Sequence, residues 1–146
     1  MSCVFCDIAA KRVDADLTVF EDEHVFAQMS LRQKPGNHGH ALVIPKRHIV
    51  NIYETTAELD APLIAAVRLL SRATKKAFAA EGISVRQNNE PAADQDVFHL
   101  HFHVIPRYRD DGFVAKPYEV LPRDIREALS ARLRAAIREE QNGPPA

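Results

Sequence analysis

The stretch "FHLHFHVIPR", residues 98–107, places three histidines at alternate positions between bulky apolar residues. The side chains of a β-strand alternate between its two faces, so His99, His101 and His103 would share one face. The apolar residues between them would share the other face and enter a core. We therefore expect a strand at residues 97–106 with its imidazoles gathered at one site.

The segments around this strand predict an antiparallel α+β domain. The connections between most of the expected strands are too short for the crossovers of a parallel sheet. We expect one domain over residues 1–146, with residues 139–146 as a frayed tail. Four further strands are expected at residues 18–20, 25–29, 41–44 and 83–89.

Two helices are expected from apolar stripes at helical spacing. The first covers residues 55–82, and its start has two interpretations. Either Thr55 and Glu58 form a capping box and leave Pro62 inside the helix, or the helix begins later with Asp60 as its cap. The second covers residues 123–140, with a stripe of Ile125, Leu129, Leu133 and Ile137.

Composition excludes several classes of protein. The formal net charge of −1 argues against a dedicated nucleic-acid binder, which usually shows a basic excess. No apolar run reaches the length of about 18 residues that a membrane span needs, so no membrane partner is expected. The first residues lack the pattern of a signal peptide, and we expect the cytosol as the compartment. Two cysteines cannot form a disulfide framework.

The histidine triplet itself has three interpretations. It is an ordinary half-buried strand, a catalytic zinc site that uses the strand histidines, or a covalent catalyst in which one imidazole attacks an electrophile. Neighbouring imidazoles repel one another when protonated, which favours the neutral form that acts as ligand, base or nucleophile. The polar side chains of Asn88, Asn89 and Gln95 precede the triplet and suit phosphoryl oxygens, which favours the covalent interpretation.

The sequence resembles the histidine triad (HIT) family, in its Hint-like branch. The resemblance rests on "CVFCDI", "VFEDEHVFAQM", "GHALVIPKRH" and "QDVFHLHFHVIPR", in that order along the chain. It implies a five-stranded antiparallel sheet with a long central helix and a C-terminal helix. It also implies a homodimer whose sheets join edge to edge, and hydrolysis or transfer at the α-phosphate of a purine nucleotide conjugate, either a phosphoramidate or a dinucleotide.

The same resemblance assigns roles to single residues. His101 would be the nucleophile that forms a nucleotidyl-histidine, and His103 would contact the phosphate or assist the leaving group. His99 and His40 would support the rings. Asn88 and Gln95, with His103, would bind phosphoryl oxygens. Neither a catalytic metal nor an organic cofactor is required.

A nucleoside slot is also implied, although ordinary core packing explains each of its apolar residues equally well. The family commonly has an aspartate for the ribose where this chain has Gln28. Family members often carry glycines in the phosphate loop where this chain has Glu90 and Asp94, and Asp96 adds a third acid. The implied slot consists of Val4, Phe5, Ile8, Phe26, Gln28 and Met29.

Cys3 and Cys6 form a C-x-x-C pair with three interpretations: a redox pair, two incidental thiols, or half of a structural zinc site. We favour the zinc site, and the resemblance completes it with His48 and His99. Two other functions stay open for the whole chain. One is the catalytic-zinc hydrolase, and the other is a non-catalytic nucleotide-binding or scaffold protein.

Overall fold

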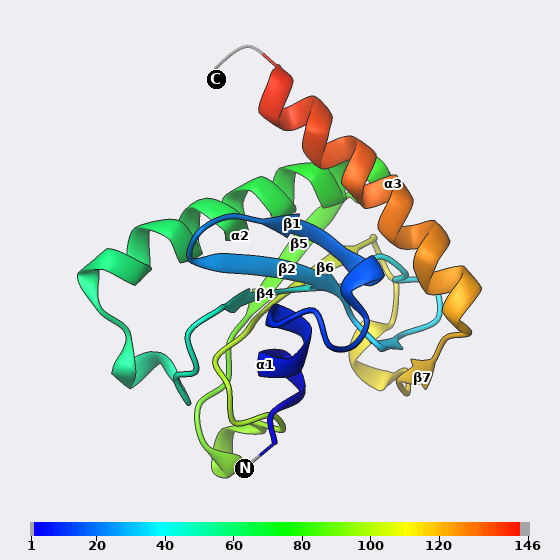
Figure 1. Ribbon diagram of the computed structural model, residues 1–146. Coiled ribbons are helices and arrows are strands. Elements are labelled where there is room, and N and C mark those ends of the chain that lie inside the picture. The colour runs from blue at the N-terminus through cyan, green and yellow to red at the C-terminus, as the bar shows by residue number, and fades with distance from the viewer. Residues whose placement is uncertain (1, 144–146) are drawn as a thin grey trace.

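A five-stranded antiparallel sheet forms the centre of the protein in the computed structural model, which describes residues 2–143 (Figure 1). This confirms the predicted fold class. The strands lie in the order β1, β2, β4, β6, β5, so that β1 and β5 form the two edges. They are β1 Thr18–Glu21, β2 Val25–Met29, β4 Ala41–Pro45, β6 Phe102–Arg107 and β5 Gly82–Arg86.

The two long helices cover one face of the sheet, and a short helix lies on the other (Figure 1). Helices α2, Ala57–Ala77, and α3, Arg123–Asn142, enclose the larger core with alternate residues of β2 and β4. Helix α1, Val4–Ala9, covers the opposite face. Its smaller core contains Phe5, Ile8, Phe26, Leu42 and Ile44.

Short elements connect this framework. A two-stranded ribbon joins β3, Arg32–Gln33, to β7, Glu119–Val120. Four single turns of 3-10 helix are η1 Ala15–Leu17, η2 Ile52–Glu54, η3 Pro91–Ala93 and η4 Phe113–Ala115. None of the helices in the described part of the chain combines the length and apolar composition needed to cross a membrane.

The strand that carries the histidines begins later than the sequence predicts. Its pairing with β4 stops at Val43 and Phe102, so His99 and His101 lie in the segment that precedes the strand. The carbonyl of Pro45 accepts a hydrogen bond from Nε2 of His99, at 2.8 Å, rather than from a backbone amide of the neighbouring strand. The strand expected at residues 83–89 likewise ends at Arg86.

Helix α2 keeps Pro62 in its interior, in agreement with one of the two predicted starts. The capping box does not form, because the N-cap is Thr56 and no side chain caps it. The helix ends at Ala77, before residue 82, because Ala79 takes a left-handed conformation with φ of 49°. The C-terminal helix continues through Asn142, so residues 139–142 of the expected tail are helical, while residues 144–146 lie outside the described chain.

The apolar stripe of α3 is buried as predicted except at its first member. Leu129, Leu133 and Ile137 join the larger core, whereas Ile125 is 42% exposed. Ile125 lies in the first turn of the helix. The helix therefore makes its apolar contacts with the sheet and with α2 from its second turn onward.

Gly39 makes the turn that delivers His40 to the sheet. Its φ is +114°, a conformation that residues with a Cβ atom rarely adopt, and the backbone amides of Gly39 and His40 both donate to the buried side-chain oxygen of Gln33, at 3.1 and 3.0 Å. A Cβ atom at this position would lie 2.5 Å from two ring carbons of Phe78. Glycine is therefore required here for two independent reasons.

We predict that Gly39→Ala lowers the free energy of unfolding by roughly 3 kcal/mol, from the positive φ and the clash with Phe78 together. Gly82→Ala is the matched control, since a Cβ atom there would meet nothing within 4 Å. Urea denaturation of both variants measures the difference. Equal stability of the two variants would contradict the requirement for glycine at position 39.

Candidate functional site

One row of cross-strand neighbours forms part of the wall of the main cavity. Gln28 pairs with Leu42, Leu42 with His103, and His103 with Arg86, across four neighbouring strands. Residues paired in this way point to the same face of an antiparallel sheet. All four line a cavity of about 460 Å³, a volume within the range of small-molecule sites.

The ring of His101 is held in one tautomer. Its Nδ1 lies 2.8 Å from the carbonyl oxygen of His99. A carbonyl only accepts hydrogen bonds, so Nδ1 carries the proton and Nε2 of the neutral ring keeps its lone pair. His101 lines the cavity although only 6% of it is exposed. Its Nε2 lies 3.6 Å from a carboxylate oxygen of Asp96. The arrangement presents a nucleophilic nitrogen at the cavity.

His103 and His40 form a second pair of rings, with Nδ1 of His103 2.9 Å from Nε2 of His40. Burial lowers the pKa of His103 to about 4, and the nearby His101 adds to the shift. Burial also holds the pKa of His40 well below its usual range. Both rings are therefore neutral at pH 7.

The unpaired nitrogen of His40 indicates how the protons are placed. Its Nδ1 is buried and has no hydrogen-bond partner among the described residues. An unpaired lone pair costs less than an unpaired N–H, so Nδ1 is the unprotonated nitrogen of His40 and Nε2–H donates to His103. His103 then carries its own proton on Nε2. This N–H is a hydrogen-bond donor for a group bound in the cavity.

The two side chains expected to bind phosphate lie in different environments. Asn88 lines the cavity. Gln95 does not line it, because its side chain is used within the loop. Its amide donates to the carbonyls of Val50 and Val97, at 2.6 and 3.1 Å, and its oxygen accepts from the backbone amide of Glu90 at 2.7 Å. Gln95 therefore holds the loop in shape and makes no contact with the cavity.

The acidic loop residues adopt backbone conformations usual for glycine. Glu90 has φ of 72° and Asp94 of 66°, at the positions where family members often carry glycine. Glu90 accepts a hydrogen bond from the hydroxyl of Tyr53 at 3.1 Å and does not line the cavity. Asp94 and Asp96 do line it, so two of the three acids reach the site.

Most of the expected nucleoside slot lines the cavity. Phe26 is the exception, since it packs beneath α1 in the smaller core. The Gln28 side chain accepts from the Thr18 hydroxyl and donates to the Asp14 carbonyl, both at 2.9 Å. One N–H of its amide remains for a ligand. The lining residues of the slot are Val4, Phe5, Ile8, Gln28 and Met29.

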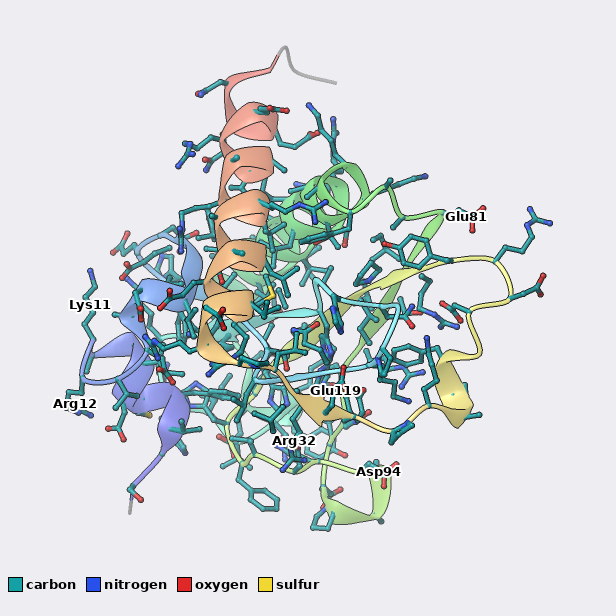
Figure 2. All side chains as sticks on the ribbon, turned by 90° about the vertical axis from the view of Figure 1, so that its right-hand side faces the viewer. Lys11, Arg12, Arg32, Glu81, Asp94 and Glu119 are labelled. Carbon is teal, nitrogen blue, oxygen red and sulfur yellow. The ribbon has the colours of Figure 1, made fainter. Side chains whose placement is uncertain are left out.

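Sequence reasoning missed about half of the cavity wall. Leu42 lies in a predicted strand whose residues are all buried, and Arg86 lies shortly before the paired asparagines, but only the strand register places them beside His103. Nothing local in the sequence indicates the others. The missed residues are Asp14, Leu17, Ser30, Leu31, Arg32, Leu42, Arg86, Val97, Tyr118 and Arg126; Figure 2 labels Arg32.

A second group of side chains lies outside the lining of the cavity. It consists of Cys3, Cys6, His48 and His99. Their ligand atoms all lie within 4.8 Å of one another. Cys3 is the N-cap of α1 and Cys6 lies in its first turn, so the helix presents both sulfurs on one side. His99 therefore belongs to this group and does not line the cavity.

The distances in this group suit tetrahedral zinc. Bonds of about 2.0–2.1 Å to nitrogen and 2.3 Å to sulfur separate tetrahedral ligands by about 3.3–3.6 Å. The two Nδ1 atoms of His48 and His99 lie 3.1 Å apart, and sulfur–nitrogen distances are 3.3, 3.3 and 3.6 Å. Nε2 of His99 donates to the carbonyl of Pro45, which leaves Nδ1 free to coordinate. The donor set and its support fit a structural zinc ion.

We predict that His103 weakens the fold as the pH falls. Its pKa of about 4 in the folded chain lies below the ordinary 6.5, so between these values the unfolded chain binds a proton that the folded chain does not. The free energy of unfolding therefore falls with pH in this window. From pH 8 to pH 5 the contribution of this ring is about 2 kcal/mol.

His103→Asn should remove that contribution, so the variant should lose about 2 kcal/mol less than the wild type between the two pH values. Urea denaturation at pH 8 and pH 5 measures both slopes. Parallel losses in wild type and variant would show that the ring titrates normally.

Comparisons with known proteins agree with this geometry. The HIT domain family model matches residues 11–110. "Protein hit" of Bacillus subtilis is 44% identical over 115 residues, which cover 78% of this chain and 77% of that protein. An adenosine 5′-monophosphoramidase of Schizosaccharomyces pombe is 33% identical over 141 residues, 92% of this chain and 100% of that protein. An adenylylsulfatase of Arabidopsis thaliana is 37% identical over 109 residues, 75% of this chain and 54% of that protein.

Solved structures share the fold. A zinc-bound histidine triad family protein from Mycobacterium smegmatis has a TM-score of 0.80 and 35% identity, and the match covers 95% of both chains. A Hit-like protein from Bartonella henselae has a TM-score of 0.81 and 38% identity, over 92% of this chain and 96% of that one. The chain therefore belongs to the HIT family.

Proposed function

We propose that the protein hydrolyses nucleotide conjugates at the α-phosphate through a covalent nucleotidyl-His101 intermediate. The observation that carries the proposal is the fixed tautomer of His101, which directs an unprotonated Nε2 toward a cavity of nucleotide size. The names of two relatives, a nucleoside phosphoramidase and an adenylylsulfatase, support this class of reaction. Both names describe cleavage of an adenosine 5′-phosphate conjugate.

The bond changes of the proposed reaction balance in two steps. First, Nε2 of His101 attacks phosphorus, and the bond from phosphorus to the leaving group breaks. The leaving group takes the electron pair and gains a proton from water if it is an amine. Water then attacks phosphorus and gives up a proton to the solvent, the N–P bond breaks, and Nε2 recovers its lone pair while the nucleoside monophosphate departs.

Neighbouring groups stabilise the charges that form. The imidazole of His101 becomes positively charged when Nε2 is bonded to phosphorus, and its Nδ1–H donates to the His99 carbonyl throughout. The Nε2–H of His103 and the amide of Asn88 are the donors for phosphoryl oxygens. His40 orients His103 and is a positioning residue.

The geometry favours this mechanism over a hydrolase with catalytic zinc. Among residues 2–143, His101 and His103 belong to no group of three or more side chains placed to share a metal ion. The Cys3, Cys6, His48 and His99 group lies apart from the cavity, and a zinc ion held there would fasten the N-terminal helix to the segment before β6. The non-catalytic alternative predicts binding without turnover.

A homodimer is also part of the proposal, with its interface at edge strand β5. This strand has a neighbour on one side only, and Val85 on it and Ile64 on α2 are 47% and 53% exposed. Sedimentation equilibrium distinguishes the chain mass of 16.4 kDa from twice that value.

A reducing compartment such as the cytosol would keep the thiols of Cys3 and Cys6 available for zinc.

We predict that the acid-quenched enzyme retains label from a nucleotide conjugate labelled at its α-phosphate, and that His101→Asn removes both the label and turnover. The loss in kcat/KM should be roughly 10³-fold or more, because the nucleophile is absent. His24→Asn is the control, since the side chain of His24 is 47% exposed and does not line the cavity. Turnover that survives in His101→Asn would contradict the covalent mechanism.

We predict one zinc ion per chain by metal analysis, and its loss in Cys6→Ser. Removal of the ion by a chelator should lower Tm by roughly 10 °C, because the metal stabilises only the folded chain. Activity measured well below the lowered Tm should persist, since the ion takes no part in bond cleavage. Complete loss of activity in a chain that circular dichroism shows to be folded would favour catalytic zinc instead.

A further inference from the structure

Arg86 continues the wall of the cavity beyond His103, the histidine that we propose binds phosphate. The row Gln28, Leu42, His103, Arg86 crosses neighbouring strands, which lie about 4.8 Å apart. Gln28 and Leu42 lie at the end of the row where the nucleoside slot is, and His103 comes next. Arg86 therefore lies on the far side of His103 from the nucleoside slot, where the leaving group of a bound conjugate would extend.

The side chain of Arg86 leans away from the nucleophile. Its guanidinium carbon lies 5.1 Å from the ring centre of Phe113, and that of Arg107 lies 4.5 Å from the same ring. Arg107 is the last residue of β6, beyond His103 in the direction that leads away from His101. Attacking and leaving groups lie roughly in line in phosphoryl transfer, so the side away from His101 is the side of departure.

The positive charge of Arg86 is not neutralised by the protein. Among the described residues no carboxylate pairs with it, whereas the neighbouring Arg107 forms an ion pair with Asp111 at 2.8 Å. Arg86 is also exposed, so its guanidinium has free N–H donors.

A second cation, Lys34, lies near this end of the cavity and forms no ion pair with a carboxylate of the described chain. Lys34 is 7% exposed, and its ammonium donates to the Phe113 carbonyl at 2.7 Å and lies 4.8 Å from the ring centre of Tyr118. Tyr118 lines the cavity, with its ring 6.2 Å from that of His40. After the larger effect of burial, Arg86 contributes to the low pKa of both His40 and His103, which indicates that its charge acts at this site.

Two of the three acidic residues that line the cavity, Asp94 and Asp96, lie toward the side of attack, and the third, Asp14, lies by Gln28 and forms an ion pair with Arg123. Asp96 is 3.6 Å from Nε2 of His101, and Asp94 belongs to the same loop. Along the direction of attack the cavity is thus polarised, with Asp94 and Asp96 near the nucleophile and the guanidinium of Arg86 beyond His103; Arg32 and Arg126 also line the cavity. The negative charge that develops on the leaving group would therefore lie near Arg86 and away from Asp94 and Asp96.

We propose that Arg86 and Tyr118 form a leaving-group subsite that selects nucleotide conjugates with an anionic leaving group, sulfate or phosphate, over those that release an uncharged amine. This inference rests on the proposed function. The guanidinium donates to the oxygens of the departing sulfate or phosphate, which leaves with the electron pair of the P–O bond and needs no proton to do so. Arg86 thereby acts on the group whose charge increases as the bond breaks.

The test compares three adenosine conjugates: adenosine 5′-phosphosulfate, diadenosine triphosphate, and a phosphoramidate that releases an uncharged amine. Arg86→Met keeps the length of the side chain and removes its charge. It should lower kcat/KM about 10- to 100-fold for the first two conjugates, the loss of one charge-assisted interaction, and less than about twofold for the third. Arg68→Met is the matched control, because Arg68 is exposed on α2 and does not line the cavity.

The first two substrates distinguish the sources of the anion, since one releases sulfate and the other ADP. An effect on either supports the subsite and names its preferred group. Equal losses on all three conjugates would assign Arg86 to general phosphate binding, and no loss on any would remove it from the site. Either of these outcomes overturns the proposal.

A binding experiment keeps this test separate from the proposed function. Calorimetry with α,β-methylene-ADP, whose second phosphorus group occupies the leaving-group position, should show binding weakened about 10-fold or more by Arg86→Met, with AMP binding unchanged. Equal effects on both nucleotides, or none, would overturn the subsite whether or not the protein is an enzyme. Absence of turnover and of labelled His101 would overturn the proposed function alone.

Discussion

The antiparallel pairing of β4 with β6 holds in place the segment that carries His99, His101 and His103. The pairing extends over only three residue pairs and ends at Val43 and Phe102. His103 is inside the ladder and so faces the cavity beside Leu42. His101 and His99 lie beyond its end but keep the alternation of a strand, since Leu100, Phe102 and Val104 all enter the larger core. The three imidazoles therefore share the face that α1 covers, where Phe5 packs against the rings of both His99 and His101. On that face His101 and His103 line the cavity, and His99 lies beside the cysteines of α1.

Local periodicity was sufficient to predict the strands, the two long helices and the gathering of histidines. Alternation of apolar and polar residues indicated the histidine strand, and apolar stripes at helical spacing indicated the helices. Periodicity was not sufficient to predict where β6 begins. That boundary depends on Pro45, which ends β4 and offers its carbonyl to His99. The position of Gln95 was hidden for a similar reason, since its partners Val50 and Val97 are brought together only by the folded loop.

The family resemblance, rather than periodicity, predicted the membership of the metal group, and the distances among its ligand atoms agree with that set. Arg86 shows the opposite case. Nothing in the sequence near it distinguishes it from other surface arginines, and its importance comes from a register between two strands. Among the missed residues, Leu42 and Arg86 are the two whose place beside His103 depends on cross-strand pairs.

Burial of the histidines has a cost that function explains. His40 keeps one nitrogen without a partner among residues 2–143, and both His40 and His103 are held neutral at the expense of stability in acid. A fold optimised for stability alone would place apolar residues there. Neutral, oriented rings are useful only to a bound group that needs hydrogen-bond donors of fixed direction.

His99, like helix α1, connects the cavity with the group of cysteine and histidine side chains. Its ring lies with Cys3, Cys6 and His48, while its backbone carbonyl holds Nδ1 of His101. A displacement of this one residue would disturb the group of Cys3, Cys6 and His48 and the ring of His101 together. Thermodynamic linkage then makes the effect mutual: to the extent that an occupant of either region restrains His99, it changes the affinity of the other region by the same factor.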